Sequence, residues 1–329
     1  MSTAGGKAGD PVTIRPMTLD DAPAVNDLMA AAEEVDRTGE HYNLEDLLEE
    51  LASPMIEVSR DWLVAETEAG IVGHSVLTPR APADGAISVG IDGTVHPDHR
   101  NQGIGSALLA RSVARAPAYV AERGAELRCS VTVSAPSVNT DLASIVEGLG
   151  LRPERYQFVM LADLRTPSPG PVPALPDGFV LSTWEGLDAD EIRAAHNRAF
   201  VDHPGFTAWD AEMWSQWVGD SRALRPALSL LVRDESGAIA AYLQTSEFDA
   251  VAEATGIREA YVAKVGTLPS SRRRGLASAL LHLALERYRE DGFDRAALDV
   301  DSENPTGALG VYERAGFRTD QRWTNYRST

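Results

Sequence analysis

The alternation of apolar and polar residues predicts the same series of elements twice along the chain. Each half begins with a short strand and an amphipathic helix, at 12–15 and 21–32 and again at 179–182 and 188–200. Alternating segments then predict two hairpins, 62–66 with 71–77 and 228–233 with 239–245, with turns at Ala69-Gly70 and Ser236-Gly237. A fourth strand, a long helix (104–123 and 276–290), a fifth strand (126–133 and 295–300) and a closing helix and strand complete each half. This order predicts one mixed α/β unit that is present twice.

A proline-dense stretch at 166–173 separates the two halves and favours neither a helix nor an internal strand. We therefore predict a first domain at 11–164, a linker at 165–177 and a second domain at 178–329. A chain of 329 residues is long enough for two such domains, each with its own core.

The composition narrows the possible partners. The formal net charge of −19 argues against nucleic acid, whose binding needs a basic surface. No apolar stretch is long enough to cross a membrane, and residues 1–10 lack the apolar segment of a signal peptide, so we expect a cytoplasmic protein. The single cysteine, Cys129, cannot form an internal disulfide and is interpreted as a small core residue.

One motif occurs in both halves, 172 residues apart. Residues 95–109 and 267–281 both read x-x-P-x-x-R-x-x-G-x-[GA]-S-A-L-L, after a strand and at the start of a helix. Glycines at such a turn let backbone N–H groups approach an anion, and arginines add donors that suit phosphate. Neither copy has the lysine of the ATP-binding loop or the glycine spacing of the dinucleotide-binding motif. The alternative is an ordinary strand-to-helix turn beside a solvated arginine patch.

The two turns resemble the GNAT acetyltransferase superfamily, in which this motif holds the pyrophosphate of acetyl-CoA. The resemblance implies two tandem mixed, largely antiparallel sheets flanked by helices, with acetyl-CoA as the cofactor. The cofactor-binding residues that we expect in the second domain are Thr267, Leu268, Arg272, Arg273, Arg274, Gly275, Leu276, Ala277 and Ser278. Those expected in the first domain are Val95, Arg100, Gln102, Gly103, Ile104, Gly105 and Ser106.

The last predicted helix differs between the halves. Residues 304–317 read N-x-x-x-A-x-x-x-Y-x-x-x-G-F, a second motif of the same superfamily. The resemblance implies that Asn304 contacts the cofactor and that Tyr312 protonates the departing CoA thiolate; otherwise Tyr312 only fills the helix–sheet interface. In the first half the tyrosine position falls on Val146 or Glu147. The first domain is therefore expected to bind the cofactor but to lack this acid.

The tandem arrangement resembles mycothiol synthase and its actinobacterial relatives, which acetylate a cysteine-glucosamine-inositol conjugate. Ala199-Phe200-Val201-Asp202-His203-Pro204 matches an AF-x-x-HP stretch of that group. Its base glutamate is replaced here, because alignment on Pro269 puts Tyr261 in that position. Glu259, two residues earlier on the same strand face, is our first candidate base, and Glu247 is the second. The residues that this resemblance brings near the acceptor, or that simply belong to the core, are His203, Trp209, Trp214 and Trp217.

The function that these motifs predict is acetyl-CoA-dependent N-acetylation of a small primary amine in the second domain, by a monomer or a homodimer. The alternatives are a non-catalytic acyl-CoA sensor and an enzyme acting on aminoglycosides, amino acids, polyamines or protein amines. The histidines form no zinc motif, so no metal is expected. Glu45, Asp46, Glu49 and Glu50 are interpreted as a solvated helix face.

Overall fold

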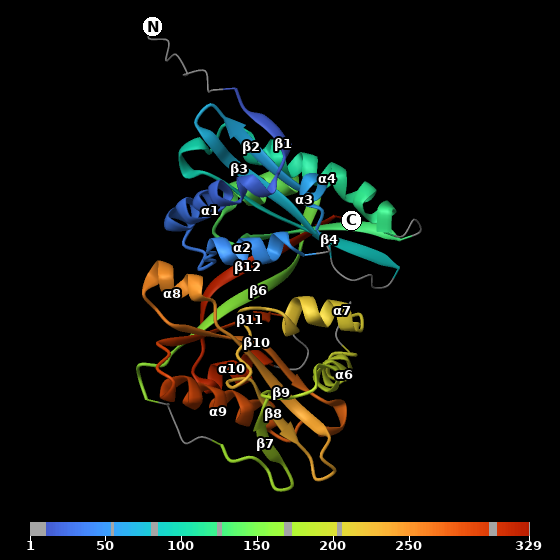
Figure 1. Ribbon diagram of the computed structural model, residues 1–329, viewed down its shortest axis with the longest axis vertical. Coiled ribbons are helices and arrows are strands. Elements are labelled where there is room, and N and C mark those ends of the chain that lie inside the picture. The colour runs from blue at the N-terminus through green and yellow to red at the C-terminus, as the bar shows by residue number, and fades with distance from the viewer. Residues whose placement is uncertain are drawn as a thin grey trace. The chain divides into compact units, whose positions relative to one another are not determined.

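The structure is a computed structural model that describes residues 11–53, 56–79, 85–123, 127–167, 173–202, 206–302 and 308–328 (Figure 1). Its contacts divide the chain into two compact units. The first consists of Met1–Glu154 and Asn325–Thr329, and the second consists of Arg155–Thr324.

The first unit is a mixed sheet with strand order β1-β2-β3-β4-β5. Its neighbouring strands are antiparallel except for β4 and β5, which are parallel. Its strands are β1 (Thr13–Pro16), β2 (Trp62–Thr67), β3 (Gly70–Pro79), β4 (Ala86–Val95) and β5 (Arg128–Pro136). Its helices are η1 (Leu19–Asp21), α1 (Ala22–Asp36), α2 (Leu44–Leu51), α3 (Val58–Asp61), η2 (Pro97–His99), α4 (Ile104–Arg123) and α5 (Thr140–Gly148).

The second unit repeats this pattern with strand order β7-β8-β9-β10-β11, again antiparallel up to a parallel last pair. Its strands are β7 (Val180–Thr183), β8 (Leu230–Arg233), β9 (Ile239–Ser246), β10 (Glu259–Thr267) and β11 (Arg295–Asp301). Its helices are α6 (Ala189–Ala199), α7 (Ala211–Trp214), the π-helical turn η3 (Ser215–Gly219), α8 (Asp249–Thr255), η4 (Pro269–Ser271), α9 (Leu276–Glu290) and α10 (Ala308–Ala315).

The two closing strands differ from the expectation drawn from chain order. The sequence placed the strand before the linker in the first domain, up to residue 164. In the structure β6 (Leu151–Asp163) pairs antiparallel with β11 through Gln157–Asp163, within the second unit. The end of β12 (Arg318–Ser328) lies beside β5, where the Val131 N–H donates to Ser328 Oγ at 2.9 Å. The unit boundaries therefore fall inside β6 and β12 and not in the proline-dense stretch, of which 168–172 lies outside the described residues.

Two helical layers cover opposite faces of the second sheet (Figure 1). Leu280, Leu281 and Tyr288 of α9 are buried against Ala241 and Leu243 of β9. On the other face, α6 and α7 bury Ile192, Ala195 and Trp214 against Leu231 and Tyr242. Because alternate residues of β9 face opposite layers, this strand separates the two cores.

The repeated mixed α/β unit is confirmed, and the predicted bounds of the long helices, 104–123 and 276–290, are those of α4 and α9. The sequence prediction did not include α8, which lies between β9 and β10. The residue that follows this helix, Gly256, has the left-handed φ of 70° that commonly ends a helix.

Candidate active site

The two repeated turns have the same backbone conformation. Asn101 and Gly103 have φ of 60° and 82°, and the residues 172 positions later, Arg273 and Gly275, have φ of 62° and 80°. Positive φ is costly for residues other than glycine, so this repeat of two left-handed residues marks a specific loop geometry. A Cβ added at Gly103 or Gly275 would meet no atom within 4 Å, which means that the space in front of each turn is open.

Each turn leads into a helix whose first N–H groups point out of the helix. In the second unit Ala279 N–H donates to Gly275 O at 3.0 Å, and in the first Ala107 N–H donates to Gly103 O at 3.0 Å. The preceding N–H groups of a helix have no partner within it, and Gly275 offers no side-chain cap. The first-turn residues Ile104, Gly105 and Ser106, like Leu276, Ala277 and Ser278, therefore present N–H groups at the positive end of a helix dipole.

The arginines at the matching position of the two turns, Arg100 and Arg272, hold the turns in place through their side chains. The Arg100 guanidinium makes two hydrogen bonds to Asp36 at 2.6 and 2.7 Å, and its Nε donates to Val95 O at 3.0 Å. Arg272 donates to Asp202 at 2.7 Å, to Ala199 O at 3.0 Å and to Thr267 O at 3.3 Å. Both guanidinium groups thus bind groups of the protein itself, so their side chains are less suited to phosphate than the sequence suggested.

The arginines that follow Arg272 are exposed. Arg274 lies over the ring of Phe179 at 4.8 Å, and Arg273 makes no ion pair with any described residue. Leu268 is 2% exposed and its N–H donates to Ala240 O, so Leu268 serves the core. Gln102 is exposed in the first turn, where its amide donates to Asp98 O at 3.5 Å. Arg273 is therefore the best-placed cation of the second turn for an anionic ligand.

In each unit the two parallel strands, one before and one after the turn in the chain, separate from each other towards the turn. Glu259–Tyr261 of β10 pair with Arg295–Ala297 of β11, and no later pairing of these strands occurs among the described residues. A register shift between Val262 and Lys264 lies at the point of separation. In the first unit, β4 and β5 pair only through Ala86–Gly90 and Arg128–Thr132 within the described part of the chain. Each sheet thus opens between its fourth and fifth strands, beside the helix N-terminus.

Tyr312 lies on α10 and packs against the main core of the second unit, with its ring 6.2 Å from the ring of Phe317. Burial raises the pKa of Tyr312 to about 12, so the phenol keeps its proton at neutral pH. Among the described residues no hydrogen bond occupies its hydroxyl. Tyr312 is thus both a core residue and an available proton donor. Asn304 lies outside the described residues.

The corresponding last helix of the first unit, α5, contains no tyrosine. Val146 is fully buried in its core, and Glu147 is exposed at the end of α5. Asn139 caps α5, where its side chain accepts the Leu142 N–H at 3.0 Å. The positions predicted to replace the tyrosine therefore carry a buried apolar side chain and an exposed carboxylate; a difference in activity between the units stays a prediction.

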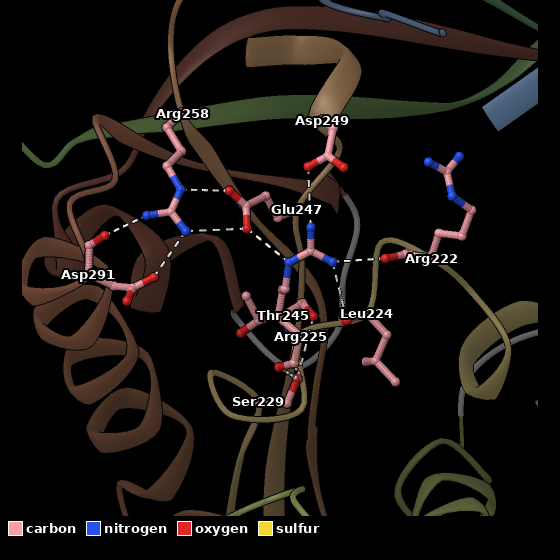
Figure 2. A network of polar contacts seen from close by, with 9 residues as sticks. All are labelled: Arg222, Leu224, Arg225, Ser229, Thr245, Glu247, Asp249, Arg258 and Asp291. Carbon is pink, nitrogen blue, oxygen red and sulfur yellow. Dashed lines mark hydrogen bonds and ion pairs between the residues drawn. The ribbon is translucent and has the colours of Figure 1, made fainter. Parts of the chain in front are cut away.

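Both candidate bases are engaged with arginines. Glu259, at the start of β10, forms an ion pair with Arg295 on β11. Glu247 binds Arg225 at 2.9 Å and Arg258 at 2.7 Å (Figure 2). Burial alone would raise the pKa of Glu247, but the hydrogen bonds from Arg258 and Arg225 outweigh it and lower that pKa. Glu247 is therefore better suited to joining its neighbouring loops than to accepting a proton. At the position of the family's glutamate, the Tyr261 hydroxyl donates to Asp299 at 3.0 Å.

The aromatic residues after α6 divide between core and surface. Trp214 is 3% exposed within the α6–α7 core, whereas Trp217 is 46% exposed. The Trp209 ring lies 4.7 Å from that of buried His196, and His203 lies outside the described residues. The interpretation of these tryptophans as core residues is confirmed for Trp214 and for the partly buried Trp209, which packs against the same core, but not for the exposed Trp217.

The sequence analysis did not single out Lys264, and it interpreted Glu50 incorrectly. Lys264 follows the register shift of β10, and its Nζ lies 5.1 Å from the centre of the Trp209 ring. The useful sequence signal was its rarity, since Lys7 and Lys264 are the two lysines of the chain. The interpretation of Glu50 as a solvated residue is wrong, because its side chain is partly buried. This burial and the charge of Asp92 raise the pKa of Glu50 to about 7.

Within the described ranges, no helix is long and apolar enough to cross a membrane. In the same part of the chain, no cluster of three or more histidine, cysteine or acidic side chains could hold a metal ion.

Comparison with known proteins agrees with this geometry. The acetyltransferase (GNAT) family matches residues 189–317, and an acetyltransferase (GNAT) domain matches residues 59–141. A mycothiol acetyltransferase of Salinispora arenicola is 34% identical over 270 residues, which cover 78% of each chain. One of Parafrankia sp. is 27% identical over 333 residues, 95% of this chain and 97% of that relative. The chain therefore belongs to the GNAT acetyltransferase family, carries two of its domains in tandem and is an acyltransferase.

Solved structures match nearly the whole length of the chain. A GCN5-related N-acetyltransferase from Sphaerobacter thermophilus superposes with a TM-score of 0.73 at 26% identity, covering 96% of this chain and 95% of that one. A tandem GNAT protein from the clavulanic acid biosynthesis pathway superposes with a TM-score of 0.69 at 22% identity, covering 97% and 98%. At 22% identity, the similarity to this second structure shows a shared fold only.

Proposed function

We propose that the second unit catalyses acetyl-CoA-dependent N-acetylation of a primary amine on a small polar acceptor. The observation that carries this proposal is the combination, in one unit, of an open anion-binding turn, separated strands beside it and a phenol hydroxyl that no described residue hydrogen-bonds. The first unit has the turn and the separated strands, but its last helix, α5, has no tyrosine. We therefore assign it a cofactor-binding role without transfer.

The residues of the turn fit the diphosphate of acetyl-CoA. The N–H groups of Leu276, Ala277 and Ser278 and the exposed Arg273 offer donors beside the open space in front of Gly275. When bound, acetyl-CoA supplies the acetyl thioester that the amine attacks. The strand edge of β10 beyond Tyr261, which β11 leaves unpaired in the described residues, offers backbone groups to orient the acyl end.

The proton balance assigns two roles. An amine that arrives as ammonium must lose a proton before it attacks, and Glu259 is the candidate that accepts it, directly or through water. The nitrogen then forms its bond to the acetyl carbon, and the carbon–sulfur bond breaks. The Tyr312 hydroxyl donates a hydrogen bond to the departing sulfur, and the proton that the nitrogen releases balances the one that the thiolate finally takes up.

The test is release of CoA thiol from acetyl-CoA with a panel of amines. The panel holds the cysteine-glucosamine-inositol conjugate, chosen because relatives bear the name mycothiol acetyltransferase, together with sugar amines, amino acids, polyamines and a peptide with a free N-terminus. Release with a small amine supports the proposal. Binding of acetyl-CoA without release for any amine favours the acyl-CoA sensor instead.

A further inference from the structure

Lys264 occupies a distinctive position at the opening of the second sheet. It lies three residues after the last β10–β11 pair, directly opposite Gln244 of the neighbouring strand β9. Residues opposite each other in an antiparallel pair point to the same face, so both side chains share the face of Tyr242. That face carries α6 and Trp209, whereas α9 packs on the other.

The ammonium of Lys264 and the amide oxygen of Gln244 have no hydrogen-bond partner among the described residues. In the part of the chain that the structure describes, no carboxylate lies within ion-pair distance of the Lys264 ammonium and no hydrogen bond occupies it. The Gln244 side chain is 3% exposed, and its Oε1 has no hydrogen-bond partner in that same part. A shielded cation and an unmatched amide are costly, and a ligand with complementary groups removes that cost.

The aromatic wall beside the ammonium is held rigidly. Asn197 of α6 bonds the Trp209 backbone twice, donating to its carbonyl and accepting its N–H, both at 2.9 Å. Arg193 adds a third bond to the same carbonyl at 3.1 Å. The cation–π contact of Lys264 with Trp209 orients the ammonium but does not neutralise it.

We propose that Lys264 and Gln244 form a subsite for a carboxylate next to the reactive amine, so that the acceptor is an amino-acid-like compound. Lys264 Nζ donates to the carboxylate, and the Gln244 amide contacts the amine end. Opposite side chains on paired strands begin about 5 Å apart, a span that one small amino acid bridges. This inference rests on the proposed function, because it assumes that the amine reacts in the second unit.

Two further facts agree with a carboxylate. Burial lowers the pKa of Lys264 to about 8, which leaves the ammonium mostly charged at pH 7. The residue 172 positions earlier, on β4, is Asp92, of opposite charge. Among the other charged groups around these strands, Glu247 and Glu259 face arginines, Asp202 faces Arg272, and Asp299 accepts a hydrogen bond from Tyr261. A carboxylate subsite is thus expected in the second unit and not in the first.

The kinetic test uses L-amino acids, each paired with its carboxamide. Lys264→Met keeps the apolar stem of the side chain and removes its charge, and the matched control is Lys7→Met. We expect the KM for carboxylate acceptors to rise about 10-fold or more in Lys264→Met, with kcat retained, as for loss of a charged hydrogen bond. The KM for carboxamides should change less than about 2-fold in Lys264→Met, and Lys264→Arg should restore part of the discrimination. An equal effect of Lys264→Met on both members of each pair, or a fall in kcat alone, would overturn the inference.

A binding measurement separates this inference from the proposed function. Reductive methylation with ¹³C-formaldehyde labels only two lysines and the N-terminal amine, and the Lys264 resonance is the one lost in Lys264→Met. Amino acids should shift that resonance more than their carboxamides or inorganic phosphate do. Such shifts without CoA release from any amine would contradict the proposed transfer and keep the subsite. CoA release without them, or a stronger shift with phosphate, would contradict the subsite alone.

Discussion

The Arg272 guanidinium lies 2.7 Å from the carboxylate of Asp202, 70 residues earlier in the chain. Arg100 and Asp36, 64 residues apart, make the same connection in the first unit. In each unit the arginine links the anion-binding turn to the segment that ends the first helix of the repeat. The turn is therefore shaped by contacts with the protein before any ligand arrives, which is a form of preorganisation.

The first prediction concerns this link. Asp202→Asn should lower the free energy of unfolding by less than about 1 kcal/mol, because both side chains are partly exposed. Arg272→Ala should cost more, since it also removes the bonds to Ala199 O and Thr267 O. Urea denaturation measures both. If Arg272→Ala is no more damaging than Asp202→Asn, the two backbone bonds do not stabilise the turn.

Tyr312 should matter for turnover more than for binding. Tyr312→Phe is expected to lower kcat by about 10²-fold, because it removes the proton donor to the thiolate and keeps the ring packing. Glu147→Gln, at the exposed position of the first unit, is the control and should leave kcat unchanged. Steady-state thiol release checks both. Full activity of Tyr312→Phe would leave Tyr312 as a core residue only.

The base is tested by the pH profile. If Glu259 accepts the proton, Glu259→Gln should depress the rate at neutral pH and move the acidic limb of the profile, with partial recovery at high pH as free amine accumulates. Because the same change removes the ion pair with Arg295, thermal unfolding must show that the variant is folded. An unaltered profile in the folded variant would assign deprotonation to solvent.

Glu247 should contribute to stability in a pH-dependent way. Its pKa is lowered in the folded protein, so its stabilising effect is present above its ordinary value of about 4.5 and is lost as the pH falls through the folded-state value. Glu247→Gln should cost about 1–3 kcal/mol at pH 7, and the difference from the wild type should shrink below about pH 4. Chemical denaturation at several pH values measures this. A difference that is constant with pH would mean that the charge of Glu247 is unimportant.

The sequence predicted the elements and the turns well because both depend on local pattern. Glycine at 103 and 275, the apolar spacing of α4 and α9, and Tyr312 in its motif are readable without knowing any distant contact. The partners of Arg100 and Arg272 were not readable, since Asp36 and Asp202 lie far away in the chain. For the same reason the sequence predicted that Arg100 and Arg272 bind phosphate, whereas in the structure they bind Asp36 and Asp202.

Strand pairing and burial were the other features beyond local pattern. Chain order placed β6 with the first domain, but strand pairing does not follow chain order, and β6 pairs with β11. The sequence alone does not distinguish Lys264 from other strand residues, because its contacts with Gln244 and the Trp209 ring depend on strand pairing and on distant segments. Glu50 likewise needed Asp92 beside it before its raised pKa could be recognised.

The most direct test of the central claim compares two matched glycines. Gly103 and Gly275 occupy the same position in the two turns, have φ of 82° and 80°, and face open space. Glutamate at either position adds bulk and negative charge where phosphate is expected, at a similar backbone cost of about 1–2 kcal/mol. Thiol release and calorimetric titration with acetyl-CoA are measured on both folded variants. The account predicts that Gly275→Glu abolishes turnover while Gly103→Glu removes at most the binding to the first unit and keeps turnover; the reverse order would place catalysis in the first unit.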